Sequence, residues 1–549
     1  MSTTRSGGRV LADQLRLHGV HEIFGVPGES YLPVLDALND MPEIRFVVCR
    51  QEVGASSMAE AAGKLTGRPG VCFVTRGPGA THAAAGCHIA RQDSTPMLLF
   101  VGQVPRAFLG REAFQEVDFR AMFGSLAKQV IQIESAERIP ELVAGAFHTA
   151  VSGRPGPVVV ALPEDVLQQQ VAVADAVPSA PARSAPSPAD MARLETLLAE
   201  SRRPLLIVGG GDWSAEVAAG LGAFAQRQAI PVCAAFRRQD YVDNENPAYA
   251  GHLGLGADPR LVDRVRAADL LLVAGARLDQ PTTAGYGLLE VPVPRQTLVH
   301  VHPDPGIPGR VYQPHLGMVS SMENLARALA ALPVAGAADR AEWLCQARRD
   351  YEAARVPPPG DDALDLARVV LAMREILPPD AIVTNGAGNY TGWVHRYFSF
   401  RRFRTQLAPV NGAMGYGVPS AIAAKLLQPD RTVVSVNGDG CFMMCGHELA
   451  TALQYDLAAV FIIVNNGMYG TIRLHQEKAY PGRPYASDLR NPDFVDLARA
   501  YGAHAERVER TEDFAPALRR SLEARRAAVI ELRTDPDVLT TSVRLSEMG

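Results

Sequence analysis

The stretch "VVSVNGDGCFMM", residues 433–444, is an apolar, β-like run that ends in Gly438-Asp439-Gly440 and passes directly into a second apolar segment. A carboxylate between two glycines at a strand end adds little to packing, but it is well placed to hold a charged group. Another apolar run, "AAVFIIVNN", ends in Asn465 and Asn466. The residues between the two turns suffice for one helix and one strand, and a right-handed crossover brings the ends of two parallel strands together. We therefore expect both turns at the edge of an α/β sheet where ligands bind.

The side chains at these turns favour a hard cation. Asp439 offers an anionic oxygen, Asn466 a neutral amide oxygen, and the main-chain carbonyl of Met468 a third oxygen. This set suits Mg²⁺ or Ca²⁺ whose remaining ligands are phosphate and water. A helix that begins near Cys441 presents N–H groups to an anion, and the glycines allow close approach. The pattern predicts a metal-bridged diphosphate.

Bulk properties exclude several classes of protein. The chain has 549 residues, of which 47% are hydrophobic and 21% charged, so a sizeable core is expected. The net charge is −5 and no Lys/Arg run stands out, which argues against nucleic acid and membrane as partners. The N-terminus lacks the apolar segment of a signal peptide, and seven scattered cysteines indicate reduced thiols and a cytoplasmic protein. A zinc site at Cys441, Cys445 and His447 is an alternative, but the spacing matches no common site.

Two proline-rich stretches divide the chain. They cover residues 175–190 and 356–362. Each of the three parts alternates β-branched runs with helical patterns, which is typical of parallel sheets with crossover helices. We predict an α/β protein of three consecutive open, mostly parallel-sheet domains, at residues 1–175, 190–335 and 360–549.

Further motifs accompany the two turns, namely "FGVPGESYLPVLDAL" (24–38), "RQEVGASSMAEAAGKLTG" (50–67), "RGPGATHAAAGCHIARQDSTPMLLFVGQV" (76–104), "FQEVDF" (114–119) and "NGAMGYGVPSAIAA" (411–424). Together they resemble the thiamine-diphosphate (ThDP) enzymes of the acetolactate synthase, pyruvate oxidase and benzoylformate decarboxylase group. The resemblance covers nearly the whole chain, in the family order of pyrimidine-binding, central and diphosphate-binding domains. It implies a homodimer or homotetramer whose active sites lie at a subunit interface.

The resemblance also assigns roles on the cofactor side. Glu52 matches the glutamate that hydrogen-bonds the pyrimidine ring of ThDP and promotes loss of the thiazolium proton. Met414 matches the apolar residue under the bent cofactor. Asp439, Asn466 and the Met468 carbonyl match the Mg²⁺ ligands. The other residues expected to bind the cofactor are Gly28, Pro78, Asn389, Tyr390, Gly438, Gly440 and Cys441.

On the substrate side, Phe114 and Gln115 match a loop that lines the acetolactate synthase pocket, and Lys128 and His475 are further pocket candidates. Two departures stand out. Glu29 occupies a place where acetolactate synthases usually carry glycine, and His82 replaces a usual asparagine. The catalytic candidates are Glu52, Gln115 and Glu29. A carboxylate at position 29 would either act as an acid/base or repel an anionic substrate. The alternative is an ordinary surface-loop residue.

The central domain binds FAD in acetolactate synthases and pyruvate oxidases. Here "GARLDQP" (275–281) replaces a "GVRFDDR"-like run and lacks its second arginine, which favours a protein without FAD. The expected function is ThDP- and Mg²⁺-dependent decarboxylation and/or carboligation of a 2-oxo acid. Alternatives are a ThDP-dependent C–C lyase on a 2-hydroxyacyl or oxalyl thioester, a flavin or nicotinamide oxidoreductase, and a silent scaffold subunit.

Overall fold

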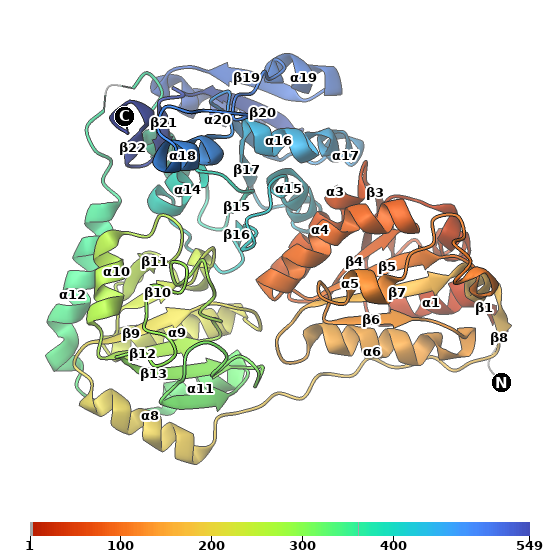
Figure 1. The fold of residues 1–549 in the computed structure, drawn as a ribbon, viewed down its shortest axis with the longest axis horizontal. Helices are drawn as coiled ribbons and strands as arrows, with labels where there is room; N and C mark the ends of the chain where they lie inside the picture. Colours follow the sequence, from red (N-terminus) through yellow and green to blue (C-terminus); the bar gives the residue numbers. More distant parts are fainter. Residues whose placement is uncertain (1–3, 361, 549) are drawn as a thin grey trace. The chain divides into compact units, whose positions relative to one another are not determined.

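A computed structural model describes residues 4–360 and 362–548, and three six-stranded sheets dominate it (Figure 1). Every strand pair within these three sheets is parallel, so the predicted fold class is confirmed. The first sheet has the order β3-β2-β4-β5-β7-β6. Its strands are β2 (Glu22–Gly25), β3 (Arg45–Val48), β4 (Gly70–Val74), β5 (Met97–Gln103), β6 (Gln129–Gln132) and β7 (Pro157–Pro163).

The second sheet has the order β11-β10-β9-β12-β13-β14 and the third the order β16-β15-β17-β18-β20-β19. The strands of the second are β9 (Pro204–Val208), β10 (Val232–Ala234), β11 (Tyr249–His252), β12 (Leu270–Ala274), β13 (Thr297–His302) and β14 (Leu316–Val319). Those of the third are β15 (Ile382–Asn385), β16 (Gln406–Leu407), β17 (Val433–Gly438), β18 (Val460–Asn465), β19 (His504–Val508) and β20 (Ala528–Arg533). Two short antiparallel pairs join β1 (Arg5–Ser6) to β8 (Gln170–Val171) and β21 (Val538–Thr540) to β22 (Val543–Arg544).

Helices connect the strands. In the first part these are α1 (Gly7–Leu17), α2 (Leu32–Asn39), α3 (Glu52–Thr66), α4 (Gly77–Asp93), α5 (Phe119–Phe123), α6 (Ile139–Val151) and α7 (Glu164–Gln168). In the middle they are α8 (Pro188–Glu200), α9 (Ala215–Arg227), α10 (Pro259–Ala267), α11 (Met322–Ala331) and α12 (Ala337–Ala354). The last part has α13 (Leu366–Ile376), α14 (Thr391–Tyr397), α15 (Gly417–Leu427), α16 (Asp439–Cys445), α17 (Leu449–Gln454), α18 (Gly470–Ala479), α19 (Phe494–Tyr501) and α20 (Thr511–Glu523). None of the described helices is long and apolar enough to cross a membrane.

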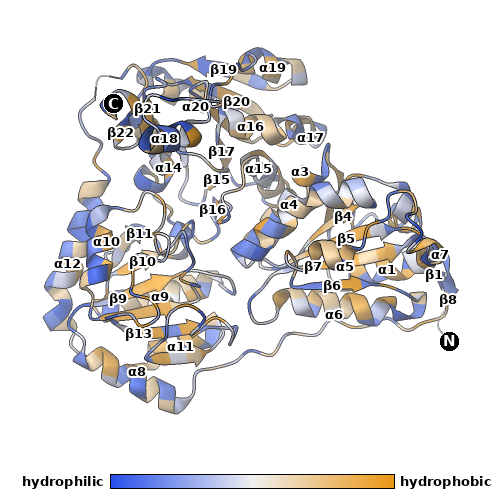
Figure 2. Ribbon diagram, viewed as in Figure 1, coloured by the Kyte–Doolittle hydropathy of each residue, from blue (hydrophilic) through white to orange (hydrophobic). Residues whose placement is uncertain are grey.

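The strands are apolar because helices cover both faces of each sheet. All residues of β5, β7 and β12 are buried, and the strands are mostly coloured as hydrophobic in Figure 2. On the first sheet, α1, α2 and α6 cover one face, while α3 and α4 pack against each other on the opposite face. Small residues permit this close helix pairing: a Cβ on Gly86 of α4 would lie 2.6 Å from the main-chain carbon of Ser56 in α3. The position of α3 against α4 is therefore tightly fixed.

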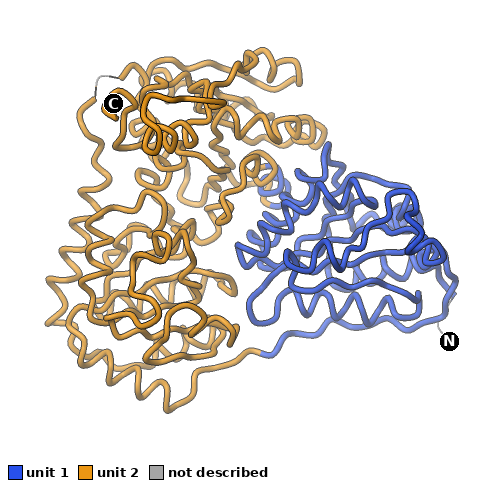
Figure 3. Tube along the Cα trace, in the orientation of Figure 1, with its two compact units in different colours: residues 1–182, 422–427 blue, residues 183–421, 428–549 orange. Residues whose placement is uncertain are grey.

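The chain forms two compact units, residues 1–182 with 422–427, and residues 183–421 with 428–549 (Figure 3). The second unit holds both the second and the third sheet. Buried hydrogen bonds join them: Asp240 accepts the main-chain N–H groups of Thr405 (3.0 Å) and Gln406 (3.2 Å), and the Asn244 side chain accepts that of Phe400 (2.9 Å). The domain limits expected from the sequence stay predictions.

Two buried histidines meet in the second unit. The rings of His252 and His395 lie 5.6 Å apart, and the Nε2 atoms of both are buried without a hydrogen-bond partner. Burial lowers the pKa of His252 to about 4, and burial, Arg237 and His252 lower the pKa of His395. Both side chains are therefore neutral in the folded protein at pH 7.

We expect the fold to lose stability as the pH falls from 7 to 5. The unfolded chain takes up protons on these histidines below about pH 6.5, whereas folded His252 stays neutral down to about pH 4, so protonation favours unfolding. For His252 alone the loss between pH 7 and pH 5 is about 2 kcal/mol. Urea-induced unfolding at the two pH values measures it. His252→Gln should flatten the pH dependence, whereas replacing the exposed His21 by Gln should not; equal slopes for both variants would contradict the assignment.

Candidate active site

The two turns singled out in the sequence meet in the structure. Strands β17 and β18 are parallel neighbours that end at Gly438 and Asn465. The Gly467 N–H and the Asn491 side chain both donate to Oδ2 of Asp439, at 2.9 and 2.8 Å. The predicted approach of the two turns is thus confirmed, and the carboxylate of Asp439 connects them.

Asp439 is a buried carboxylate whose hydrogen-bond donors are neutral. Only 2% of the residue is exposed, and the Gly440 N–H donates to its other oxygen at 2.8 Å. Burial raises the pKa of Asp439, although the hydrogen bonds from Gly440, Asn491 and Gly467 oppose this effect. A cation bound here would stabilise the charged form. The donor chemistry therefore fits a metal ion.

One cavity of about 220 Å³ lies beside these turns. Its lining includes every residue of the second unit that the sequence assigned to cofactor binding. These are Asn389, Tyr390, Met414, Gly438, Asp439, Gly440, Cys441, Asn466 and Met468. Residues that the sequence reasoning missed also line it, among them Ala387, Tyr469, Thr471, Ile472, Thr534 and Leu539. Ala387, Tyr469 and Thr534 follow the ends of strands β15, β18 and β20, and this position is the signal that would have identified them.

Asn389 presents a donor to this cavity. Its main-chain N–H donates to the Thr471 hydroxyl at 3.1 Å, and that hydroxyl donates back to its side-chain oxygen at 2.9 Å. The Nδ2 atom of Asn389 is buried and has no hydrogen-bond partner. Thr471 therefore fixes the amide so that its NH₂ group is available to a phosphate oxygen.

The glycines of the first turn make room for tyrosine rings. A Cβ on Gly438 would lie 2.9 Å from the ring of Tyr390, and one on Gly440 would lie 2.5 Å from the ring of Tyr469. The Tyr390 hydroxyl donates to the sulfur of Cys441 at 3.3 Å. Side chains at either glycine would displace the aromatic walls of the cavity.

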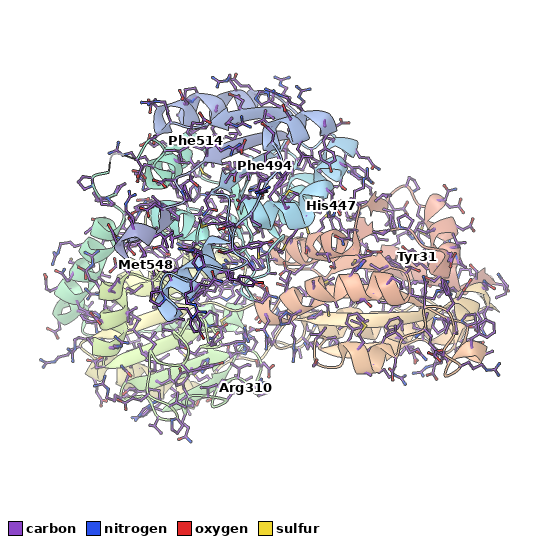
Figure 4. All side chains as sticks on the ribbon, turned by 45° about the horizontal axis from the view of Figure 1, so that its top comes forward. Tyr31, Arg310, His447, Phe494, Phe514 and Met548 are labelled. Carbon is purple, nitrogen blue, oxygen red and sulfur yellow. The ribbon has the colours of Figure 1, made fainter. Side chains whose placement is uncertain are left out.

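Two details of this region correct the sequence reasoning. The helix begins at Asp439 rather than near Cys441, and the single helix expected between the two turns is broken into α16, a 3₁₀ turn at Gly446–Glu448 and α17. The Phe442 ring packs edge-on against Phe494, which is labelled in Figure 4, at 5.7 Å between ring centroids. A Cβ on Gly446 would lie 2.6 Å from that Phe442 ring. This aromatic contact is compatible only with glycine at the break.

Glu52 is the first residue of α3 in the first unit. Its side chain is 14% exposed, and its Oε2 lies 3.0 Å from Nδ1 of His82, on the second turn of α4. A Cβ on Gly79 would lie 3.3 Å from Oε1 of Glu52. The carboxylate thus has one oxygen held by an imidazole and the other beside a residue without a side chain.

Glu29 forms an ion pair that the sequence did not reveal. Its Oε1 accepts from Nη2 of Arg76 at 2.6 Å, and Nη1 of Arg76 lies 3.7 Å from Glu164. The Arg76 side chain is 9% exposed and that of Glu29 68%. The guanidinium of Arg76 offsets the negative charge of Glu29. The pair therefore repels an anionic substrate much less than an isolated carboxylate would.

Residues 76–79, at the start of α4, bring several of the remaining candidates together. The main-chain carbonyl of Gln115, a residue with φ 64°, accepts the Gly77 N–H at 3.1 Å. Gly28 packs on Thr75, where a Cβ would lie 2.7 Å from the Thr75 side chain, and Pro78 is exposed in the first turn of α4. Glu29, Gln115 and Glu52 are therefore all adjacent to the start of α4.

Three pocket candidates receive less support. The Lys128 ammonium donates to the main-chain carbonyls of Thr149 (2.6 Å) and Ser152 at the end of α6. Phe114 is 76% exposed. His475 is exposed on α18 and is not among the lining residues of the cavity. Their roles stay predictions. Groups of three or more His, Cys, Asp or Glu side chains suited to a metal are absent from the described part of the chain, so the zinc alternative gains no support.

Comparisons with known proteins match the three parts of the chain in order. Residues 5–122 match the thiamine pyrophosphate enzyme N-terminal TPP binding domain, residues 191–329 the central domain, and residues 386–532 the C-terminal TPP binding domain. The acetolactate synthase large subunit of Parasynechococcus marenigrum is 35% identical over 92% of this chain and 84% of its own. That of Corynebacterium glutamicum is 34% identical (94% and 85%), and the acetolactate synthase isozyme 2 large subunit of Escherichia coli is 32% identical (93% and 92%).

Proposed function

Because this chain belongs to the thiamine pyrophosphate enzyme family, we propose that it catalyses the ThDP-dependent decarboxylation and/or carboligation of a 2-oxo acid. It is an enzyme of the acetolactate synthase type, as its relatives of similar length are named. The observation that carries the proposal is the single cavity in which all nine cofactor-side residues of the second unit gather around the buried Asp439. Nothing in the site favours a thioester lyase, an oxidoreductase or a silent scaffold subunit.

The residues present fit the cofactor. Asp439, Asn466 and the Met468 carbonyl would hold Mg²⁺, because a carboxylate and two neutral oxygens leave ligand positions for phosphate and water. The Met468 carbonyl accepts one hydrogen bond, from Gly470 at 3.0 Å, and keeps its second lone pair. The buried Asn389 NH₂ group would donate to the diphosphate.

Three residues of the chain would have distinct roles toward the bound cofactor and the substrate. When bound, ThDP supplies the electron sink that allows a 2-oxo acid to lose CO₂. Glu52 would hold a proton at a pyrimidine ring nitrogen through Oε1, the oxygen beside Gly79. Met414 would support the cofactor from the cavity wall, and Gln115 would contact the substrate from the loop against Gly77.

We also propose a homodimer or homotetramer in the cytoplasm. Near the cavity, large apolar side chains are exposed on the second unit, with Met443 at 48%, Met444 at 44% and Ile472 at 50%. Such a patch favours burial against another copy. All seven cysteines are free and six are buried, as in proteins of reducing compartments. Light scattering of the purified protein tests the oligomeric state.

The purified enzyme is expected to be colourless. In the segment after β12, Arg277 pairs with Asp279 at 2.9 Å, and Pro281 stands where the resembled run has its second arginine. Without that cation a flavin diphosphate loses a binding partner. An absorbance spectrum of the denatured protein measures bound flavin, and a stoichiometric band near that of FAD would contradict the expectation.

Glu29 is expected to bias the choice of acceptor through its pairing with Arg76. Glu29→Gln leaves the Arg76 charge without its close partner, which favours an anionic second 2-oxo acid over a neutral acceptor. Carboligation with pyruvate as acceptor, relative to simple decarboxylation, should rise about two- to tenfold. Arg76→Gln should shift the product ratio in the opposite direction, and Glu164→Gln serves as the weaker, matched change. A ratio unaffected by all three variants would place the pair outside the pocket.

The proposed function is tested by offering a panel of 2-oxo acids with ThDP and Mg²⁺ and analysing products by mass spectrometry. Acetolactate or another hydroxyketone from pyruvate would establish carboligation, and an aldehyde alone would establish simple decarboxylation. Release of products only from oxalyl or 2-hydroxyacyl thioesters would contradict the proposed function and would identify a ThDP-dependent C–C lyase.

A further inference from the structure

The Glu52–His82 contact has a fixed geometry. Glu52 begins α3 and His82 lies on the second turn of α4, and these two helices are locked together by the close approach of Gly86 to Ser56. Nδ1 of His82 reaches Oε2 of Glu52 at 3.0 Å. A neutral imidazole that carries its proton on Nδ1 donates a hydrogen bond to the carboxylate and leaves Nε2 toward solvent, because the His82 side chain is 51% exposed.

Two further titratable groups of the described residues interact with the charge of Glu52, and both stay neutral near pH 7. They are Tyr31 of the turn that precedes α2, and Cys72 of β4 (Tyr31 is marked in Figure 4). Burial, reinforced by the Glu52 charge, raises the pKa of both groups far above 7. The Tyr31 hydroxyl is in addition committed to the main-chain carbonyl of Val26, at 2.5 Å. A neighbouring ion pair is that of Glu29 with Arg76, the residue just before α4.

We propose that His82 is a positioning residue that orients Glu52 through Nδ1. Through this contact, proton sharing by Glu52 becomes dependent on pH. The proposal rests on the proposed function, in which Glu52 shares a proton with the cofactor. Neutral His82 holds Oε2 and leaves Oε1, beside Gly79, for that proton. Protonated His82 places a positive charge 3.0 Å from the carboxylate, which stabilises the ionised form and opposes proton sharing.

Activation of the cofactor should slow as the pH falls. Histidine side chains ordinarily gain a proton between pH 8 and pH 5. As the pH falls through this range, the cation holds Glu52 as a carboxylate, and activation of the cofactor slows. An asparagine at position 82 keeps a donor at the place of Nδ1 and cannot titrate, so it preserves the orientation and removes the pH dependence.

The first test uses the protein without cofactor. With histidines labelled at Cε1, the NMR signal of His82 is assigned by its loss in His82→Asn, and its titration midpoint is compared between wild type and Glu52→Gln. We expect the midpoint to be lower in Glu52→Gln by about half a pH unit or more, because the carboxylate stabilises the imidazolium. The control His88→Asn, on the same helix, should leave the His82 midpoint in place. An unmoved midpoint in Glu52→Gln overturns the coupling, whatever the activity of the enzyme.

The second test follows exchange of the thiazolium C2 proton in the holoenzyme against pH. Wild type should lose exchange toward pH 5 more steeply than His82→Asn, and His82→Ala should be slower than His82→Asn by about three- to tenfold at pH 7.5. Identical pH profiles for wild type and His82→Asn overturn the proposal. A moved NMR midpoint in an enzyme that turns over no 2-oxo acid would instead overturn the proposed function and leave the coupling in place.

Discussion

Glu52→Gln should slow exchange of the ThDP C2 proton by about 10²–10⁴-fold, the usual contribution of an acid–base group. Glutamine keeps the size of the side chain and a contact to His82, but it cannot share a proton with the pyrimidine nitrogen. The effect is expected to be large because Glu52 is mostly shielded from water, at 14% exposure, so a water molecule replaces its function poorly. Quenched-flow deuterium exchange, read by NMR of the released cofactor, measures the rate directly.

The control for this prediction is Glu141→Gln, which removes a carboxylate from the same unit at an exposed ion pair with Arg138. It should exchange like wild type. Binding of ThDP to Glu52→Gln, measured by calorimetry, should remain, because the diphosphate side of the cavity is intact. Exchange at the wild-type rate in Glu52→Gln would mean that another group activates the cofactor.

Asp439→Ala should weaken ThDP binding in the presence of Mg²⁺ by about 10²-fold or more, because it removes the one carboxylate among the proposed metal ligands. The Asp439 carboxylate is buried, and its hydrogen-bond donors among the described residues are the neutral groups of Gly440, Gly467 and Asn491, so a bound cation would offset its charge. Calorimetric titration of ThDP with and without Mg²⁺ measures the loss.

Asp439 also connects the two turns, so a matched variant is needed to separate structure from metal binding. Asn491→Ala removes the hydrogen bond from Asn491 to Oδ2 but keeps the carboxylate. It should cost about tenfold or less, whereas Asp439→Asn, which keeps the side-chain shape and loses the charge, should resemble Asp439→Ala. Equal affinities for Asp439→Asn and wild type would contradict the metal site.

The sequence predicted the features that depend on strand pattern and crossover rules. Strands such as β17 and β18 are apolar runs, and parallel pairing of neighbouring strands places their carboxyl ends, with Asp439 and Asn466, at the same edge of the sheet. The other cofactor-side residues of the second unit, such as Asn389, Tyr390 and Met414, are predicted by the family resemblance instead. Their roles toward ThDP and Mg²⁺ came from the resemblance and await the measurements above.

The sequence did not predict contacts made between side chains of different elements. Arg76 and Glu29 are far apart in the chain, and no periodicity indicates that they pair at 2.6 Å. The same holds for His82 with Glu52, and for Thr471 with Asn389. The break at Gly446 depends on the Phe442 ring, which is set by packing against Phe494 rather than by local propensity.

The central claim is that this chain acts on 2-oxo acids only through ThDP and a metal held at Asp439. The most direct test dialyses the protein against EDTA and measures CO₂ release from 2-oxo acids after adding ThDP, Mg²⁺, both or neither. The account predicts release with both additions, little with either alone, and none in Asp439→Ala. Undiminished release without additions, or no release from any 2-oxo acid with both, would contradict it.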